Sequence, residues 1–304
     1  MSNDIKKKFI WVCFIMLALL LVGCDKEKVD EEVQWALGEA GIDLPERTSI
    51  KLSDNNNVIC IVDSKIDASC ELFSGIWEND IVSSSSFVGT SHGMYVAGII
   101  CSNADKDEYV SVLNNAKLYY IEIDSEEIDI SQLITELKNA QEAGAKVVNC
   151  SFVTTQYYEE LYEYIRDSEM LFVCASGNNH QDEILYPAAF ELDNVISVAG
   201  TNRYGVIGEH SNFSADIDIA APGEDILCVT SEKGVYENVS GSSLATAYVT
   251  SACAYIINEM GCSAKETKEI LLNCCDEWIT LDGKVKGNKT LSFEGIINYL
   301  QSEK

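Results

Sequence analysis

Short apolar runs rich in β-branched residues alternate with segments of helical spacing along most of the chain. Five runs have the length and composition of buried strands: Val58–Val62, Lys117–Ile123, Lys146–Phe152, Met170–Ala175 and Asn194–Ala199. Six segments have the apolar spacing of helices: His92–Cys101, Ser131–Ala143, Tyr157–Arg166, Ser243–Met260, Ala264–Asp276 and Phe293–Gln301. Continuously apolar strands interleaved with helices indicate a parallel sheet that is covered on both faces. The pattern therefore predicts an α/β fold of three layers, a doubly wound and mainly parallel sheet with helices on both faces.

The first residues have a different pattern from the rest of the chain. Three lysines, Lys6 to Lys8, precede a short apolar run that ends at Leu21-Val22-Gly23-Cys24. A basic segment before such a run is typical of a secretory signal peptide, and the tetrapeptide resembles the bacterial lipobox, in which the cysteine becomes a lipidated N-terminus. We expect a signal peptide at residues 1–23, a short tether at 24–32 and one domain at 33–304. An uncleaved membrane anchor is the alternative.

Both interpretations of the leader place the domain outside the cytoplasmic membrane. With lipidation at Cys24, the protein is expected at the extracellular face of a bacterial cell membrane, held there by its lipid. Its formal net charge is −28, from 21 basic and 49 acidic residues. This balance argues against nucleic acid as a partner, because phosphate binding requires a surplus of Lys and Arg. An acidic surface instead attracts cationic peptides, unless the charge serves only solubility.

The twelve cysteines do not form a recognisable framework. Cys60, Cys150 and Cys174 lie within apolar runs, where cysteine behaves as a small buried hydrophobe. No Cys or His spacing suits zinc, and the stretch containing Asn103, Asp105 and Asp107 is interpreted as a solvated loop. The residues therefore predict free thiols and no identifiable metal site.

Three residues stand where an α/β sheet carries its chemistry, at the carboxyl ends of strands and the starts of helices. Asp63 directly follows a predicted strand, His92 opens a predicted helix, and Ser243 lies where a small-residue turn enters a long apolar helix. Each alone has the ordinary explanation of a turn former or helix cap. Together they supply a hydroxyl nucleophile, a base and a carboxylate, the groups needed for acyl transfer.

Three segments that contain these residues, and a fourth that contains Asn178, resemble motifs of the subtilisin-like serine peptidases, the subtilases. They are Val62-Asp63-Ser64-Lys65-Ile66-Asp67, His92-Gly93-Met94-Tyr95-Val96-Ala97-Gly98, Ala175-Ser176-Gly177-Asn178-Asn179 and Gly241-Ser242-Ser243-Leu244-Ala245. The resemblance implies that Ser243 is the nucleophile, His92 the general base and Asp63 the residue that orients His92. It also implies that the Asn178 amide and the Ser243 N–H hold the oxyanion.

The resemblance further implies where the substrate binds. Two segments are expected to flank its P1 side chain and pair with its backbone: Ser151, Phe152 and Val153, and Ala175, Ser176 and Gly177. Val153 stands where the family usually has glycine, so a subsite should be narrower here. Calcium is common in the family, but its ligands cannot be identified in this sequence, and no cofactor is assigned.

The function predicted from these features is that of a surface-anchored serine endopeptidase. A narrow-specificity role is favoured, the processing of an exported peptide precursor such as a bacteriocin leader or a signalling peptide. The expected partners are a peptide or protein substrate, preferably cationic, and the membrane through the lipid anchor. Two alternatives are a broad-specificity housekeeping protease and a catalytically weak binding or immunity lipoprotein. The complete set of Asp63, His92, Asn178 and Ser243 argues against the latter.

Overall fold

The structure is a computed structural model of the chain. It describes residues 35–40, 50–52, 58–79, 88–104, 109, 111–124 and 127–304. The predicted signal peptide, Cys24 and the tether lie outside the described residues. Within the described part, no helix combines the length and the apolar character needed to cross a membrane.

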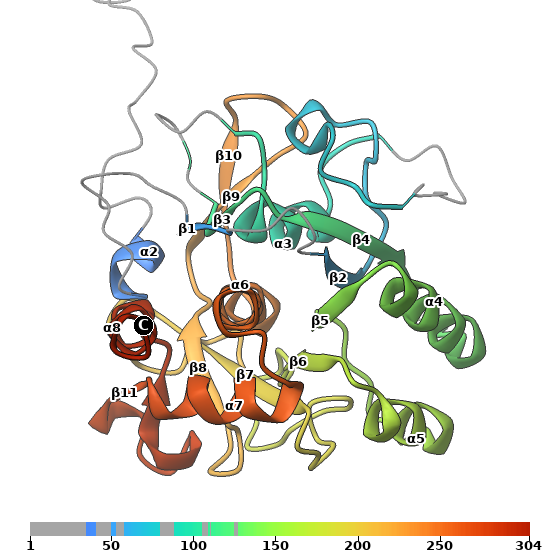
Figure 1. Cartoon of the computed structure of the whole chain (residues 1–304). Coiled ribbons are helices and arrows are strands. Elements are labelled where there is room, and N and C mark those ends of the chain that lie inside the picture. Colours follow the sequence, from blue (N-terminus) through green and yellow to red (C-terminus); the bar gives the residue numbers. More distant parts are fainter. Residues whose placement is uncertain are drawn as a thin grey trace, which may run out of the picture.

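An eight-stranded sheet forms the centre of the described domain (Figure 1). The strands follow the order β11-β12-β8-β7-β6-β5-β2-β4. Their bounds are Val58–Asp63 (β2), Lys117–Glu122 (β4), Ala145–Cys150 (β5), Leu171–Ala175 (β6), Val195–Thr201 (β7), Ile219–Pro222 (β8), Asp276–Glu277 (β11) and Lys289–Thr290 (β12). Only β11 and β12 pair antiparallel in this sheet, and all other neighbours are parallel. The carboxyl ends of β2, β5, β6 and β7 therefore share one edge.

Alternate residues of the strands enter two different hydrophobic cores, since successive side chains of a strand point to opposite faces. In β2, Ile59 and Ile61 face one core, whereas Val58, Cys60 and Val62 face the other. Every residue of β2 is buried, which explains why its sequence is apolar without alternation.

Helices cover both faces of this sheet (Figure 1). One side holds α2 (Trp35–Glu39), α3 (His92–Ile100), α6 (Ser242–Met260), α7 (Ala264–Asn273) and α8 (Phe293–Ser302). The other side holds α4 (Ile130–Glu142) and α5 (Glu159–Asp167). The predicted three-layer, mainly parallel α/β fold is thus confirmed.

Smaller elements complete the described structure. A parallel pair joins β1 (Ile50–Lys51) to β3 (Leu113–Asn114), and an antiparallel hairpin joins β9 (Ile226–Val229) to β10 (Tyr236–Val239). Short 3₁₀ helices span Glu71–Phe73, Ile279–Leu281 and Lys286–Asn288.

The central helix α6 packs on β5, β6, β7 and β8 and also contacts α3, α7 and α8. Nearly all of its side chains are buried, which accounts for a sequence that is apolar or small on every side. It ends at Gly261, whose φ of 63° is readily adopted by glycine. The helix that follows, α7, ends at Asn273 rather than at the predicted Asp276, because Asp276 instead pairs with β12.

The ten cysteines in the described residues are free thiols. Burial raises the pKa of Cys60 and of Cys174 well above the ordinary thiol value, so both remain protonated. With Cys150, these residues pack in the core beneath α4 and α5 and act there as small apolar side chains.

Candidate active site

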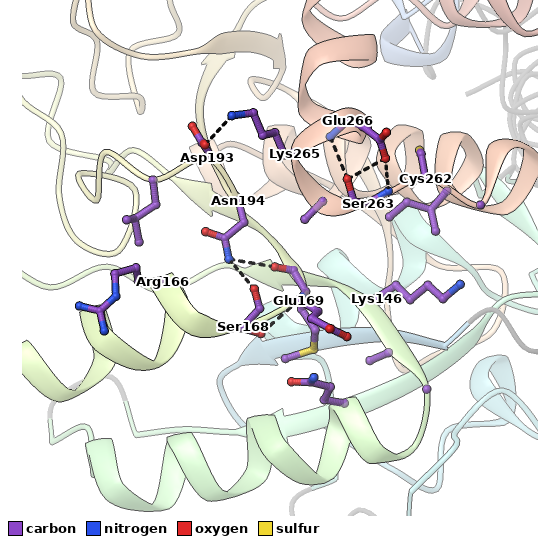
Figure 2. A pocket seen from close by; sticks show the side chains of 18 of the residues that line it. Lys146, Arg166, Ser168, Glu169, Asp193, Asn194, Cys262, Ser263, Lys265 and Glu266 are labelled. Carbon is purple, nitrogen blue, oxygen red and sulfur yellow. Dashed lines mark hydrogen bonds and ion pairs between the residues drawn. The ribbon is translucent and has the colours of Figure 1, made fainter.

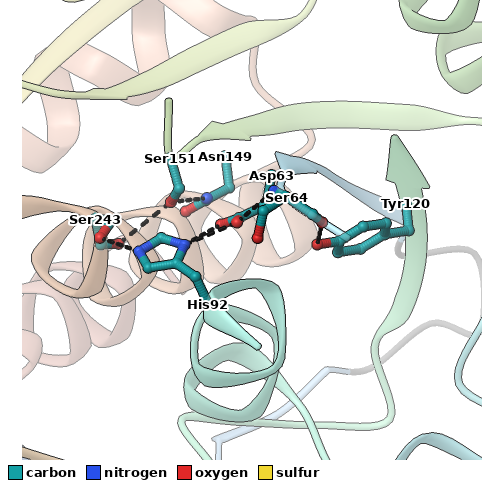
Figure 3. Close-up of polar contacts among 7 residues, drawn as sticks. All are labelled: Asp63, Ser64, His92, Tyr120, Asn149, Ser151 and Ser243. Atoms are coloured by element: carbon teal, nitrogen blue, oxygen red, sulfur yellow. Dashed lines mark hydrogen bonds and ion pairs between the residues drawn. The ribbon is translucent and has the colours of Figure 1, made fainter. Parts of the chain in front are cut away.

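Asp63, His92 and Ser243 meet at the carboxyl edge of the sheet. Asp63 is the last residue of β2, His92 is the first of α3, and Ser243 lies in the first turn of α6. Since α3 and α6 pack against each other on the same face, their first turns come together beside the end of β2. Figure 3 shows His92 between Ser243 and Asp63.

Hydrogen bonds link the three side chains in one line. His92 Nδ1 lies 2.7 Å from Asp63 Oδ1 and 3.0 Å from Oδ2, and His92 Nε2 lies 2.7 Å from Ser243 Oγ. An ionised carboxylate can only accept, so Nδ1 carries the proton and donates to Asp63. The lone pair of the neutral ring is then at Nε2 and accepts the Ser243 hydroxyl. The arrangement can therefore take the proton from Ser243 as its oxygen attacks an acyl group.

The charge of Asp63 governs the basicity of His92. Asp63 is 1% exposed and accepts a further hydrogen bond of 2.6 Å from the Ser64 N–H, while the His92 side chain is 37% exposed. The Asp63 carboxylate raises the pKa of His92, although burial acts in the opposite direction. The pair thereby favours the imidazolium that forms when His92 receives the Ser243 proton.

Asn178 lies near the nucleophile with its carbonyl side anchored. Asn178 Oδ1 accepts hydrogen bonds from the Ser242 N–H at 2.8 Å and from Ser242 Oγ at 2.9 Å. These two bonds fix the orientation of the Asn178 amide, because with Oδ1 directed at Ser242 the Nδ2 group must point away from Ser242. A Cβ atom added at Gly241 would lie 3.2 Å from Ser243 Oγ and 3.5 Å from Asn178 Nδ2. The glycine thus leaves open the space beside the amide and the first turn of α6, where an anion can be bound.

The two expected substrate segments follow neighbouring strands. Ser151, Phe152 and Val153 come directly after β5, and Ala175, Ser176 and Gly177 form the end of β6 and the turn beyond it. Phe152 is buried, as are Ala175, Ser176 and Gly177, whereas Ser151 and Val153 are partly exposed. Of these six residues, only Ser151 and Val153 are accessible at the surface.

Gly177 illustrates why this turn has its sequence. Its φ is +119°, and a Cβ atom there would lie 2.5 Å from Asn212 Nδ2 and 2.9 Å from Leu185 Cδ1. Neither the conformation nor the space admits a side chain. The Gly177 N–H also donates to Ser242 Oγ at 3.3 Å, which connects the turn to the residue that anchors Asn178.

Two supporting groups were not identified from the sequence. Asn149, buried in β5, donates to Ser151 Oγ at 2.7 Å and accepts from Thr250 Oγ1 of α6 at 3.0 Å. Ser151 Oγ in turn donates to the Ser243 carbonyl at 3.4 Å. The second group is Tyr120, whose hydroxyl bonds to the Ser64 carbonyl. The signal for Asn149 was present, since it is the one amide in the predicted strand Lys146–Phe152 and lies between Val148 and Cys150.

No set of three or more His, Cys, Asp or Glu side chains in the described segments is arranged to hold a metal ion. Asp105 and Asp107, from the acidic stretch, lie outside the described residues.

A cavity of about 1040 Å³ lies at the opposite edge of the sheet (Figure 2). It is lined near the amino ends of β5, β6 and β7 by Lys146, Met170 and Asn194, and at the start of α7 by Ser263. It contains none of the predicted site residues. Its Lys265 side chain is paired with Asp193 at 2.8 Å, so this charge is already neutralised.

Comparison with known proteins adds to this geometry. The model of the subtilase family matches residues 54–293. The cell wall-associated protease of Bacillus subtilis (strain 168) is 31% identical over 215 residues, covering 66% of this chain and 24% of that protein. An intracellular serine protease of Paenibacillus polymyxa is 32% identical over 175 residues, covering 54% of this chain and 53% of that protein. The chain thus spans between a quarter and about half of the length of these relatives.

Solved structures share the fold over most of the chain. The patellamide maturation protease PatA has a TM-score of 0.69 at 24% identity, covering 83% of this chain and 99% of that one. The nisin leader peptidase NisP from Lactococcus lactis has a TM-score of 0.69 at 20% identity, covering 88% and 94%. At these identities the likeness concerns the architecture, which is that of the subtilisin-like proteases.

Proposed function

The chain belongs to the subtilase family, and on this premise we propose that it is a serine endopeptidase that acts through Ser243, His92 and Asp63. The proposal is carried by the unbroken line of hydrogen bonds from Asp63 through His92 to Ser243, with 2.7 Å at both links. This is the arrangement that an acyl-transfer enzyme needs before a substrate arrives.

In the proposed reaction, Ser243 Oγ attacks the carbonyl carbon of the scissile peptide bond as its proton moves to His92 Nε2. Asp63 stabilises the resulting imidazolium and keeps Nδ1 protonated, so that the ring stays in the useful orientation. His92 then gives the proton to the leaving amine, and the C–N bond breaks. A water molecule, deprotonated by the same nitrogen, hydrolyses the acyl ester and restores Ser243.

The negative charge on the carbonyl oxygen is assigned to two donors, the Asn178 Nδ2 group and the Ser243 backbone N–H. Asn178 is suited to this because its other amide atom is held by two hydrogen bonds from Ser242. A donor that is fixed in advance stabilises the transition state without reorganisation during the reaction.

The proposal is tested by covalent labelling with a fluorophosphonate probe, which reacts with an activated serine. Wild type should be labelled, and Ser243→Ala should not. Ser251→Ala is the matched control, because Ser251 is also on α6 and buried but bonds only within its helix, to the Ala247 carbonyl at 2.8 Å. A folded wild-type protein that remains unlabelled would contradict the peptidase assignment, and labelling of Ser243→Ala would identify a different nucleophile.

For the biological role, we propose narrow-specificity processing of an exported peptide precursor rather than general proteolysis. The patellamide maturation protease and the nisin leader peptidase, which share the fold, are named for processing steps of this kind. In this chain, partly exposed Val153 borders the expected substrate strand, where its branched side chain restricts the space.

A peptide-library cleavage profile tests the specificity. Wild type should accept few sequences, and Val153→Gly should accept more, with larger side chains gaining the most. An equally broad profile for both proteins would favour a housekeeping protease.

We also propose that lipidation of Cys24 holds the enzyme at the outer face of the cell membrane. Support comes from the sequence, in which the apolar run and the Leu21-Val22-Gly23-Cys24 tetrapeptide precede the domain. In a bacterial host, Cys24→Ala should prevent incorporation of a fatty-acid label. Equal incorporation in wild type and the variant would refute the anchor.

A cationic substrate is proposed from the net charge of −28. At low salt, cationic peptides should be cleaved faster than neutral ones of matched sequence, and the difference should shrink as the Debye length falls from about 30 Å at 0.01 M salt to about 8 Å at 0.15 M. A salt-independent ratio would show that the charge serves solubility only.

A further inference from the structure

Beyond the three catalytic side chains, a tyrosine hydroxyl lies at the turn that presents Asp63. Tyr120 belongs to β4, which lies beside β2 at the edge of the sheet. Its hydroxyl donates a hydrogen bond of 2.6 Å to the carbonyl of Ser64, the residue after Asp63. In Figure 3, Tyr120 lies on the far side of Asp63 from His92. A buried polar group thus reaches across from the next strand to the backbone of the turn.

The position of this hydroxyl is itself fixed. Tyr120 is 3% exposed, and both of its backbone polar groups are bound by the Asn79 side chain at 2.9 Å. Trp77 packs edge-on against the ring with 5.8 Å between centroids. The ring therefore has little freedom to move away from Ser64.

The protonation state of Tyr120 suits a donor. Burial, followed by the nearby carboxylates of Asp63 and Glu122, raises the pKa of Tyr120 well above its usual range. The O–H group is therefore protonated near neutral pH and able to donate. It donates to the Ser64 carbonyl.

We propose that Tyr120 is a positioning residue for Asp63, acting through Ser64. Ser64 connects the two through the two peptide groups on either side of its Cα: its carbonyl accepts from Tyr120, and its N–H donates to Asp63 Oδ1 at 2.6 Å. When the carbonyl is held, the N–H points correctly and the carboxylate keeps its orientation toward His92. This inference rests on the proposed peptidase function, since it assigns a support to that catalytic set.

Gly93 brings the Tyr120 hydroxyl close to the start of the helix that carries His92. A Cβ atom at Gly93 would overlap the Tyr120 hydroxyl and would lie 2.9 Å from Tyr120 Cζ and 3.3 Å from the Ser64 carbonyl oxygen. Gly93 follows His92 in the first turn of α3. The Tyr120 hydroxyl therefore lies against both the turn that carries the carboxylate and the helix start that carries the imidazole. It is placed to set the separation of Asp63 and His92.

The substitution that tests this is Tyr120→Phe, which removes one oxygen and preserves the ring. Tyr119→Phe is the matched control, because Tyr119 is the next residue of β4, points into the opposite core and donates to Glu136 at 3.3 Å. The measurement is the rate constant of fluorophosphonate labelling as a function of pH, together with the thermal midpoint of each protein.

For Tyr120→Phe, we expect labelling at the high-pH plateau to slow about tenfold, as for loss of one orienting hydrogen bond. The acid limb of the pH profile should also shift to lower pH. Asp63 is the charged group that raises the pKa of His92, so a loosened carboxylate raises it less. Glu122 faces Tyr120 but remains unchanged in both variants. Tyr119→Phe should keep the wild-type rate and midpoint.

Several results would overturn the inference. A Tyr120→Phe protein with the wild-type rate and pH midpoint would show that the hydroxyl is dispensable. A slower rate with an unchanged midpoint, or one that follows only the folded fraction, would assign it a structural role. If wild type itself is not labelled, the proposed peptidase function fails, which is a separate outcome from failure of the Tyr120 inference.

Discussion

Replacement of Asn178 by alanine should remove a proposed oxyanion donor while leaving the hydrogen bonds among Asp63, His92 and Ser243 in place. Asn178 is exposed, and its known partners are the N–H and hydroxyl of Ser242. Ser242 is fully buried, so removing the Asn178 side chain takes the acceptor from its N–H and hydroxyl, and stability should fall by about 1–3 kcal/mol. The proposed oxyanion also loses one of its two donors.

The expected decrease in kcat follows from the loss of one of the two oxyanion donors. A single lost donor in an oxyanion site costs about 2.7–4 kcal/mol, so kcat should fall by about 10²–10³. Because the donor is needed when charge develops, KM should change little. Ser242→Ala provides an intermediate case, because it removes only one of the two bonds that hold Asn178 Oδ1. One neutral hydrogen bond contributes about 0.5–1.5 kcal/mol, which corresponds to roughly a twofold to thirteenfold lower kcat.

The assay is hydrolysis of p-nitrophenyl acetate, whose acyl transfer passes through the same kind of oxyanion as peptide hydrolysis. The values of kcat and KM are compared for wild type, Ser242→Ala and Asn178→Ala, with circular dichroism as the measure of folding. The expected order of kcat is wild type, then Ser242→Ala, then Asn178→Ala. A folded Asn178→Ala enzyme that retains more than about a third of the wild-type kcat would refute the role assigned to this amide.

Two further predictions concern the same site. The rate of ester hydrolysis should fall as the pH is lowered through a midpoint above about 6.5, because Asp63 raises the pKa of His92 and only the neutral imidazole accepts the Ser243 proton. In Asp63→Asn the midpoint should move down, since burial is then left to lower that pKa, and an unmoved midpoint would exclude the pairing. Gly241→Ala should fold normally, because the φ of 166° at Gly241 is extended backbone. Its rate of ester hydrolysis should nevertheless fall at least about 10²-fold, because the methyl group would lie 3.2 Å from Ser243 Oγ and 3.5 Å from Asn178 Nδ2. Wild-type turnover in that variant would show that the space beside Gly241 is not used.

The long apolar elements could be predicted from the sequence because their pattern and their burial have the same cause. Strands such as β6 and helices such as α6 are buried on all sides, so nearly all of their residues are apolar or small. The strand β8 was not predicted, since its four residues, Ile219 to Pro222, are mostly small and carry little β-propensity. The pairing of Asp276 in β11 was also missed, because a two-residue strand at a sheet edge depends on its partner β12.

In the candidate active site, the sequence identified the proposed reacting side chains better than the residues that hold them in position. Asp63, His92 and Ser243 each occur in a local motif, and the structure brings their side chains into contact. Tyr120 carries no such signal, because its partner Ser64 is 56 residues away and the contact exists only once β4 lies beside β2. The same motif residues also did not indicate which side chains are exposed, and Phe152 of the expected substrate segment is buried in the core.

The distance along the chain between the reacting groups has a consequence for when the activity can first exist. His92 and Ser243 are separated by 151 residues, and β2, which carries Asp63, lies between β4 and β5, both later in the chain. A ribosome that has completed the first half of the chain has therefore released a base and a carboxylate but no nucleophile. Folding dominated by such distant contacts is slow, and the three side chains can meet only once α6 has packed on the sheet. The proposed nucleophile is thus the last of the three side chains to be synthesised, and the site can be assembled only after Asp63 and His92 are already in place in the chain.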